Sequence, residues 1–468
     1  MFSTQVEYRK EENEFTPGET FASGLARNTT GQGSAGEAEF VEYGLELSIP
    51  IFGEDFTLPF VKSLVLEGAV RRVERDGEGG PFNLTSSSED DVFNLGLRWK
   101  PIDDLTVRGS VSSAIRSPSI VELFGAGITG FSTLGRADGN PCDEDVIDSG
   151  PAIRRTNCEA FVESLGLDVS VLEGFQAPGG AAPAAGASNP GLENEESDSW
   201  TAGFVYTPSF IKGLTVSFDY YELELTGEIG LAGLGTECFD SPTFPEALVG
   251  GFDACNALVF AVEDPNNPGS FIVPSVNPIN GQPVNPVANP GTPAQDQQAL
   301  TSTFSFFPTL NQGSTQIRSY LLTADYGFDA GSLGAFRVNG SAYRLLEFSE
   351  TAAGNTNPRD GEDGDAEWNT VLTVSHQLGA LSHNLQWFFT SSTLDNVQTD
   401  PSTFSELPAD FRRPSFNVLN YSARYAINEN FTAQFVVNNI ADRDFNPTAF
   451  ETANGLGRRF SVGLTAKF

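Results

Sequence analysis

Apolar and polar residues alternate with a period of two through most of this chain. The last residues, RRFSVGLTAKF, place Phe460, Val462, Leu464 and Phe468 on one face, with polar or small residues between them. The same pattern recurs in many upstream segments, for example in residues 105–115. A period of two is that of a β-strand, whose successive side chains point to opposite faces. The sequence therefore predicts a chain made mostly of strands.

The links between these strands differ in length in a regular way. Short links read KPIDDL, TPSFIKGL, FDAGSL, LGALSH and INEN, and they take turns with long links at residues 118–197, 229–305, 351–364, 396–415 and 442–456. A soluble sandwich has no reason to sort its links, whereas a membrane β-barrel has short turns on one side and long loops on the other. Counting by this rule predicts about fourteen strands, with both chain ends on the short-turn side.

Composition agrees with a protein that crosses a membrane by strands. No apolar run approaches the ~18 residues that a membrane-spanning helix requires. Hydrophobic residues make up only 39% of the chain, yet aromatics reach 11% and Phe alone counts 38. A closed barrel pairs every backbone group, needs apolar side chains only on its outer face and favours aromatics at the interfaces. We therefore expect an all-β, antiparallel transmembrane outer-membrane β-barrel; the alternative is a soluble β-sandwich that buries the same alternate faces.

The charge of the chain restricts its partners. Acidic residues outnumber basic ones 62 to 26, which gives a formal charge of −36. Nucleic acid is not expected as a partner, because binding would bring like charges together. An acidic solvated surface explains the excess most simply, and a role in cation capture is the alternative.

The cysteines suggest an oxidising compartment. There are four, in two short-range pairs: Cys142 with Cys158, and Cys238 with Cys255. Such spacing in loop-like sequence predicts two disulfides, with free thiols as the alternative. A zinc site is disfavoured because there is no CxxC and the only histidines, His376 and His383, lie far away in strand-like sequence.

Three stretches resemble one known family. Residues 109–125, GSVSSAIRSPSIVELFG, carry an Arg, a small residue and a Pro before a Ser-x-x-Glu-Leu run. Residues 189–229 begin with Asn-Pro-x-Leu and continue through a Glu-x-Ser-x-x-Trp strand. Residues 417–468 carry Asn-Asn-Ile-x-Asp, then Gly-Arg-Arg-Phe, and end on Phe. In this order the stretches resemble TonB-dependent outer-membrane receptors.

The resemblance implies a barrel of about 22 strands closed by an N-terminal plug. It also implies active uptake of a scarce ligand, such as a siderophore or an oligosaccharide, across the outer membrane of a Gram-negative bacterium, powered by the TonB–ExbB–ExbD complex. It further implies that Phe460, Val462, Leu464 and Phe468 form the signal read by the barrel assembly machinery. The alternatives are a passive porin-like channel and, less favoured, a secreted soluble β-protein.

The expected domain assignment follows from the N-terminal sequence. MFSTQVEYRKEENEF has neither the basic start nor the apolar core of a secretory signal and reads as the middle of a strand. We expect residues 1–468 to be the C-terminal part of a receptor barrel, a fragment without signal peptide, plug or TonB-binding segment, in which Met1 is not the natural start.

The sequence contains no recognisable catalytic constellation, and no enzyme activity or cofactor is predicted. There is no Gly-x-Ser-x-Gly elbow and no phosphate-binding loop. A receptor would bind its ligand with its long loops and with inward side chains at their bases. Candidates are Arg116, Glu122, Phe124, Trp200, Tyr343 and Arg344. Alternatives are a structural ion pair for Arg116 and an interfacial position for Trp200, and the adjacent Tyr343 and Arg344 cannot both face inward.

One acidic segment has the chemistry of a calcium ligand. Residues 358–368, PRDGEDGDAEW, contain Asp360, Glu362, Asp363 and Asp365, the oxygen ligands that Ca²⁺ prefers. Their spacing is not that of a twelve-residue calcium loop. A solvated acidic loop is therefore favoured, and no metal site is predicted.

Overall fold

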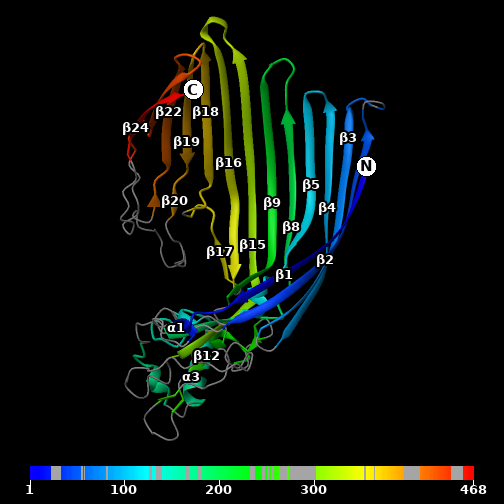
Figure 1. Cartoon of the computed structure of the whole chain (residues 1–468). Helices are drawn as coiled ribbons and strands as arrows, with labels where there is room; N and C mark the ends of the chain where they lie inside the picture. The colour runs from blue at the N-terminus through cyan, green and yellow to red at the C-terminus, as the bar shows by residue number, and fades with distance from the viewer. Residues whose placement is uncertain are drawn as a thin grey trace.

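One antiparallel sheet of 14 long strands makes up most of the computed structural model of this chain (Figure 1). The predicted fold class and the predicted number of about fourteen strands are confirmed. In chain order the strands are β1 (Phe2–Phe15), β2 (Ser34–Phe52), β3 (Ser63–Gly79), β4 (Leu84–Ile102), β5 (Leu105–Arg116), β8 (Glu195–Tyr206), β9 (Leu214–Leu231), β15 (Ser302–Asp329), β16 (Ala335–Ala352), β18 (Trp368–Leu378), β19 (Leu381–Thr390), β22 (Phe416–Ala426), β23 (Phe431–Asn438) and β24 (Arg459–Ala466).

The structure describes most of the chain. The described residues are 1–22, 33–53, 56, 58–80, 83–125, 129–132, 140–164, 168–176, 182–231, 238–244, 248–249, 252–253, 258–260, 262–263, 271–272, 302–352, 355–362, 364–394, 412–443 and 457–467.

Each long strand pairs antiparallel with the next long strand along the chain. In Figure 1 the sheet forms a curved wall from β1 to β24. Among the described residues no pairing joins β24 to β1, so these two strands are the edges of the wall.

The two ends of the wall differ, as the link lengths predict. Tight links such as residues 379–380 and 427–430 lie at one end, and both chain termini are at that same end (Figure 1). The long links gather at the other end. The strict alternation does not extend to the N-terminal strands, because β3 and β4 are joined on the long-loop side by residues 80–83 alone. Gly80 and Asn83, with φ of 72° and 50°, supply the left-handed residues that allow so tight a link.

The two faces of the wall have opposite chemistry. On the inner face cross-strand partners form hydrogen bonds, such as Ser110 with Thr201 at 2.8 Å, and ion pairs, such as Arg108 with Asp219 at 2.7 Å. On the outer face large apolar side chains are exposed, including Leu45, Leu47, Leu66, Val70, Phe93, Leu95, Leu97 and Leu372. In an outer-membrane barrel this apolar face contacts lipid. None of the helices in the described part of the chain is long and apolar enough to cross a membrane.

Short elements lie among the long loops. They are α1 (Glu19–Ala22), α2 (Ile120–Phe124), β6 (Thr129–Ser132), α3 (Ile153–Ser164), η2 (Val169–Leu172), β7 (Ala182–Ala187), β10 (Leu248–Val249), β11 (Phe252–Asp253), β12 (Leu258–Phe260), β13 (Val262–Glu263), β14 (Phe271–Ile272), β17 (Asn355–Pro358), β20 (Thr393–Leu394) and β21 (Arg412–Arg413); η3 (Gly331–Leu333) is in a short turn. Many of the most deeply buried side chains belong to these loops and not to the sheet, among them Leu123, Val162 and Phe175.

Candidate functional site

Arg116 is the centre of an ion-pair cluster where the long loop after β5 begins. It is the last residue of β5 and the register partner of Glu195, the first residue of β8. Its Nε and Nη2 donate to the Glu195 carboxylate at 2.6 and 2.5 Å, and its Nη1 donates to Glu122 at 3.2 Å. Two carboxylates thus share one guanidinium, while about half of the Arg116 side chain stays exposed.

Glu122 also organises the short helix α2. The Ser119 Oγ accepts from the Glu122 N–H, and the Glu122 carboxylate accepts from the Ser119 N–H at 2.7 Å, so the two residues form a capping box. Burial alone raises the pKa of the Glu122 carboxyl, but hydrogen bonds from Arg116 and Ser119 outweigh burial and hold this pKa below its ordinary value. Glu122 therefore stays ionised and links the strand end to the helix.

Phe124 packs against the backbone of the β2–β3 hairpin. Its side chain is only 2% exposed and lies over three glycines, Gly36, Gly77 and Gly79. A Cβ added to Gly79 would lie 3.0 Å from the Phe124 Cβ and 2.6 Å from the Gly36 Cα. The absence of side chains at these positions is what lets α2 approach the strands. We call this arrangement of Phe124 on Gly36, Gly77 and Gly79 the glycine platform.

The other predicted ligand contacts lie elsewhere on the sheet. Tyr343 pairs in register with Leu321 and Asn369 on the inner face, whereas Arg344 pairs with Tyr320 and Trp368 on the outer face. The Arg344 guanidinium lies 4.9 Å from the centre of the Trp368 ring.

Trp200 is on the outer face of β8, where its ring lies 4.8 Å from that of Tyr220. Arg116, Glu122 and Phe124 therefore lie together at the start of the loop after β5. Trp200, Tyr343 and Arg344 lie elsewhere on the sheet.

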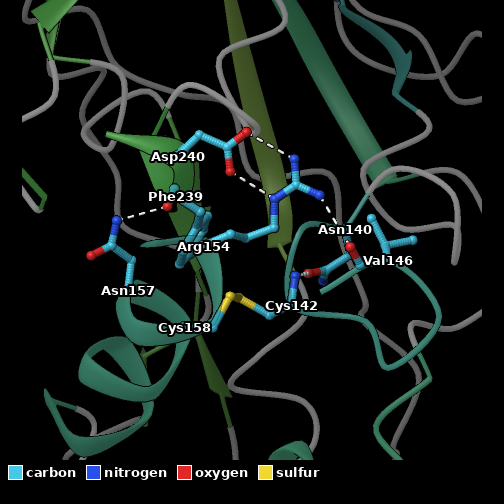
Figure 2. The surroundings of a disulfide bond; sticks show 8 residues. All are labelled: Asn140, Cys142, Val146, Arg154, Asn157, Cys158, Phe239 and Asp240. Carbon is cyan, nitrogen blue, oxygen red and sulfur yellow. Dashed lines mark hydrogen bonds and ion pairs between the residues drawn. A yellow bond between two sulfur atoms is a disulfide. The ribbon is translucent and has the colours of Figure 1, made fainter. Parts of the chain in front are cut away.

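A compact unit of loop residues lies beyond this cluster. We call it the cap and define it as the described residues of 140–176 together with 238–244. The predicted disulfide between Cys142 and Cys158 is present and ties α3 to the preceding segment (Figure 2). Cys238 is also disulfide-bonded, and Cys255, the partner predicted for it, lies outside the described residues.

Arg154 joins the two parts of the cap. This side chain is only 8% exposed, and its Nε and Nη2 donate to Asp240 at 2.6 and 2.8 Å (Figure 2). Its Nη1 donates to the Val146 carbonyl at 3.1 Å. One helical turn on, the Asn157 amide donates to the carbonyls of Phe239 and Ser241. The loops after β5 and β9 are therefore one packed body in this region.

Asparagine amides connect the loop after β5 to the neighbouring strands of the wall. Asn189 donates to the Thr309 carbonyl at 3.0 Å, and Asn311 donates to the carbonyls of Glu193 and Gly227. Asn194 donates to Asp90 of β4 at 2.5 Å. The C-terminal end of this loop, residues 189–194, is therefore fixed to the wall.

In the acidic segment 358–368, Arg359 forms ion pairs with three carboxylates, two of them from the segment itself. Arg359 contacts Glu350 and Glu362 at 2.7 Å and Asp365 at 3.4 Å. Asp360 is in the same segment, and Asp363 lies outside the described residues. Within the described residues no group of His, Cys, Asp or Glu could hold a metal ion. An ion-paired acidic loop describes this segment.

The C-terminal strand presents the alternation expected of an assembly signal. Phe460, Val462 and Leu464 of β24 are exposed on one face of this edge strand, and Phe468 lies outside the described residues. That the assembly machinery reads them stays a prediction. His376 and His383, expected in strands, are register partners on β18 and β19 with ring centres 5.5 Å apart.

Three residues of the site were not predicted individually. Glu195 begins the Glu-x-Ser-x-x-Trp motif quoted above, and this position at the start of a strand was the available signal. Arg154 and Asp240 are 86 residues apart in loop sequence, and no local pattern connects them.

The fold and the loop side together define a class of protein: a transmembrane β-sheet of outer-membrane type, with a polar inner face and elaborate loops at one end. The family described as TonB dependent receptor-like, beta-barrel matches residues 1–440, and this chain belongs to that family. The family consists of outer-membrane receptors and transporters, not enzymes.

Solved structures agree in fold. The FrpB iron transporter of Neisseria meningitidis (F3-3 variant) is similar with a TM-score of 0.50 and 12% identity over 100% of this chain and 52% of the transporter. The siderophore receptor PirA of Acinetobacter baumannii is similar with a TM-score of 0.50 and 11% identity over 100% of this chain and 60% of the receptor. This chain thus spans little more than half the length of either. No curated protein matches the sequence.

Proposed function

We propose that this chain is the C-terminal barrel part of an active transporter that imports a scarce ligand across the outer membrane. Family membership over residues 1–440, together with the two-faced sheet of 14 strands, carries the proposal. In it, the TonB–ExbB–ExbD complex supplies the energy, the barrel assembly machinery inserts the chain, and residues 1–468 are part of a longer protein that includes a plug.

The ligand class proposed is a ferric siderophore or an oligosaccharide. The names of the two similar structures, an iron transporter and a siderophore receptor, favour the first. Within this chain we assign ligand contact to the cap and to two inward side chains of the sheet, Arg116 at the end of β5 and Tyr343 of β16. Arg116 keeps about half of its side chain exposed beside its carboxylate partners. Glu122 and Phe124 are proposed to position α2.

Uptake by cells tests the proposal. The gene is deleted and restored in its host, and uptake of ⁵⁵Fe-labelled siderophores and of labelled oligosaccharides is compared. The expected result is uptake of one ligand that requires the gene and is abolished by a protonophore or by deletion of tonB. Gene-dependent uptake that survives both treatments would instead identify a passive channel. Recovery of the protein from the soluble fraction would contradict a membrane role altogether.

A further inference from the structure

The turn between β2 and β3 is the turn at the short-turn end of the wall with the most exposed large apolar side chains among the described residues. It exposes the apolar side chains of Phe56, Leu58 and Phe60, with Phe56 at 61% and Phe60 at 74%. The next turn, between β4 and β5, consists of Asp103 and Asp104 alone. The turn between β8 and β9 exposes two large apolar side chains, Phe210 at 75% and Ile211 at 37%, and the turns before β16 and β23 expose one each, Leu333 and Ile427. Large apolar side chains at a turn tip are costly in water, so this turn calls for an explanation.

The backbone of this turn holds Phe60 in a strained conformation. Phe60 has φ of 64°, in the left-handed region that a bulky L-residue rarely adopts and that Gly or Asn tolerates far better. The Trp99 Nε1 donates to the Phe60 carbonyl at 3.0 Å, and the Val61 N–H donates to the Leu58 carbonyl at 2.9 Å. The chain therefore maintains an unfavourable backbone that presents a phenyl ring outward, a combination that points to a function.

The exposed side chains continue the lipid-facing surface of the sheet. Phe56 stacks on Phe52 with ring centres 5.2 Å apart. Phe52 is the register partner of Leu64, and Leu64 that of Trp99, so these three side chains share the apolar outer face. The turn thus extends the surface that faces acyl chains in an outer-membrane barrel.

We propose that the turn between β2 and β3 is a membrane anchor whose Phe56, Leu58 and Phe60 side chains insert into the periplasmic leaflet of the outer membrane. The occupant is phospholipid, at the boundary between headgroups and acyl chains where aromatic rings are favoured. The ion pair between Lys62 and Asp103 lies at the base of the turn and places charged side chains there, at the level of the lipid headgroups in this arrangement. The inference rests on the membrane location of the fold and is independent of what the protein transports.

Spin labels in isolated outer membranes test this anchor. The described cysteines are all disulfide-bonded, so an added cysteine is the site of labelling. Labels at Phe56→Cys and Phe60→Cys are compared with Leu47→Cys on the lipid face and with Glu429→Cys in the exposed turn between β22 and β23. Relaxation by oxygen, which partitions into lipid, is measured against relaxation by a water-soluble nickel chelate.

The anchor predicts that both turn labels behave like the label at residue 47, with oxygen more effective than the chelate. Two other outcomes would overturn it: labels that behave like residue 429, meaning that the turn is in water, and labels reached by neither reagent, meaning that a protein covers it. Should either variant be made in low yield, Leu58→Cys reports on the same turn.

Phe60→Gly gives an independent readout because glycine accepts the left-handed backbone without strain. Removing one inserted aromatic should shift the balance between inserted and exposed turn roughly tenfold toward water, and the chelate should then reach the label at Phe56→Cys. A label at residue 56 that is unchanged by Phe60→Gly would contradict the role given to Phe60.

Discussion

Arg154 and Asp240, 86 residues apart in the sequence, lie face to face in the cap and share two hydrogen bonds of 2.6 and 2.8 Å. The next residue, Arg155, makes an equally direct contact with Asp148, but at the surface, where 45% and 70% of the two side chains are exposed. Two adjacent arginines therefore make similar ion pairs in opposite surroundings, one largely buried and one in water.

Arg154→Ala should loosen the cap much more than Arg155→Ala. Removal of one partner of a buried pair leaves the other charge uncompensated, which costs about 3 kcal/mol, whereas a surface pair contributes under about 1 kcal/mol. Hydrogen–deuterium exchange of α3 should accelerate roughly 100-fold in the first variant and little in the second. Equal effects would mean that the Arg154 pair does not hold the two loops together.

Gly79→Ala should destabilise the glycine platform. The added Cβ would lie 2.8 Å from the Ala35 carbonyl oxygen and 3.0 Å from the Phe124 Cβ, and such overpacking costs about 1–3 kcal/mol. Gly44→Ala is the matched control, since its Cβ would meet only Gln5 atoms at 3.6 and 4.0 Å. Thermal loss of the heat-modifiable gel mobility compares the two variants. A Gly79→Ala protein as stable as Gly44→Ala would show that Phe124 is not tightly packed there.

Acid should release α2 through Glu122. Its folded-state pKa lies below the ordinary value of 4.5, so its stabilisation is complete above that value and is lost as the pH falls through the depressed folded-state pKa. Amide protection of residues 119–125, measured from pH 6 down to pH 3, should decrease at the acid end. Glu122→Gln should lower protection at pH 6 and flatten the profile, while Glu163→Gln on α3 should leave it unchanged. A profile unaffected by Glu122→Gln would assign the acid response to another carboxylate.

Replacement of Cys142 and Cys158 by serine should weaken the cap without unfolding the barrel. The bond closes a sequence separation of 16 residues, and a loop of about that length is worth roughly 3 kcal/mol. Because both sulfur atoms are buried, dithiothreitol should reduce this bond slowly in the native protein and quickly after denaturation. Mass spectrometry of alkylated protein measures both rates. Rapid reduction in the native state would mean that the cap opens readily.

The sheet could be predicted from sequence because its signals are local. Alternation within each strand determines which side chains share a face, and the lengths of the links separate turns from loops, so residues 105–115 were recognisable as a strand without knowledge of their neighbours. The expected separation of Tyr343 from Arg344 follows from the same period, and the two residues do lie on opposite faces.

The site could be predicted only in part. The capping box of Ser119 and Glu122 has a three-residue spacing that sequence reveals. The pairing of Arg154 with Asp240, by contrast, depends on where two long loops end in space. The glycine platform was equally invisible, because Gly36 and Gly79 acquire their meaning only when the hairpin places them under Phe124.

Because of the glycine platform, the root of the long loop after β5 and its exposed surface differ in how well they tolerate substitution. A new ligand would select for new side chains on the exposed surface of the loop, for example at Arg155 and Asp148, where substitutions meet solvent. At the root, a change at Phe124 requires compensating changes in two strands that lie more than forty positions earlier in the printed sequence. Substitutions on the exposed surface of the loop therefore leave the wall intact, whereas a substitution at its root also disturbs β2 and β3.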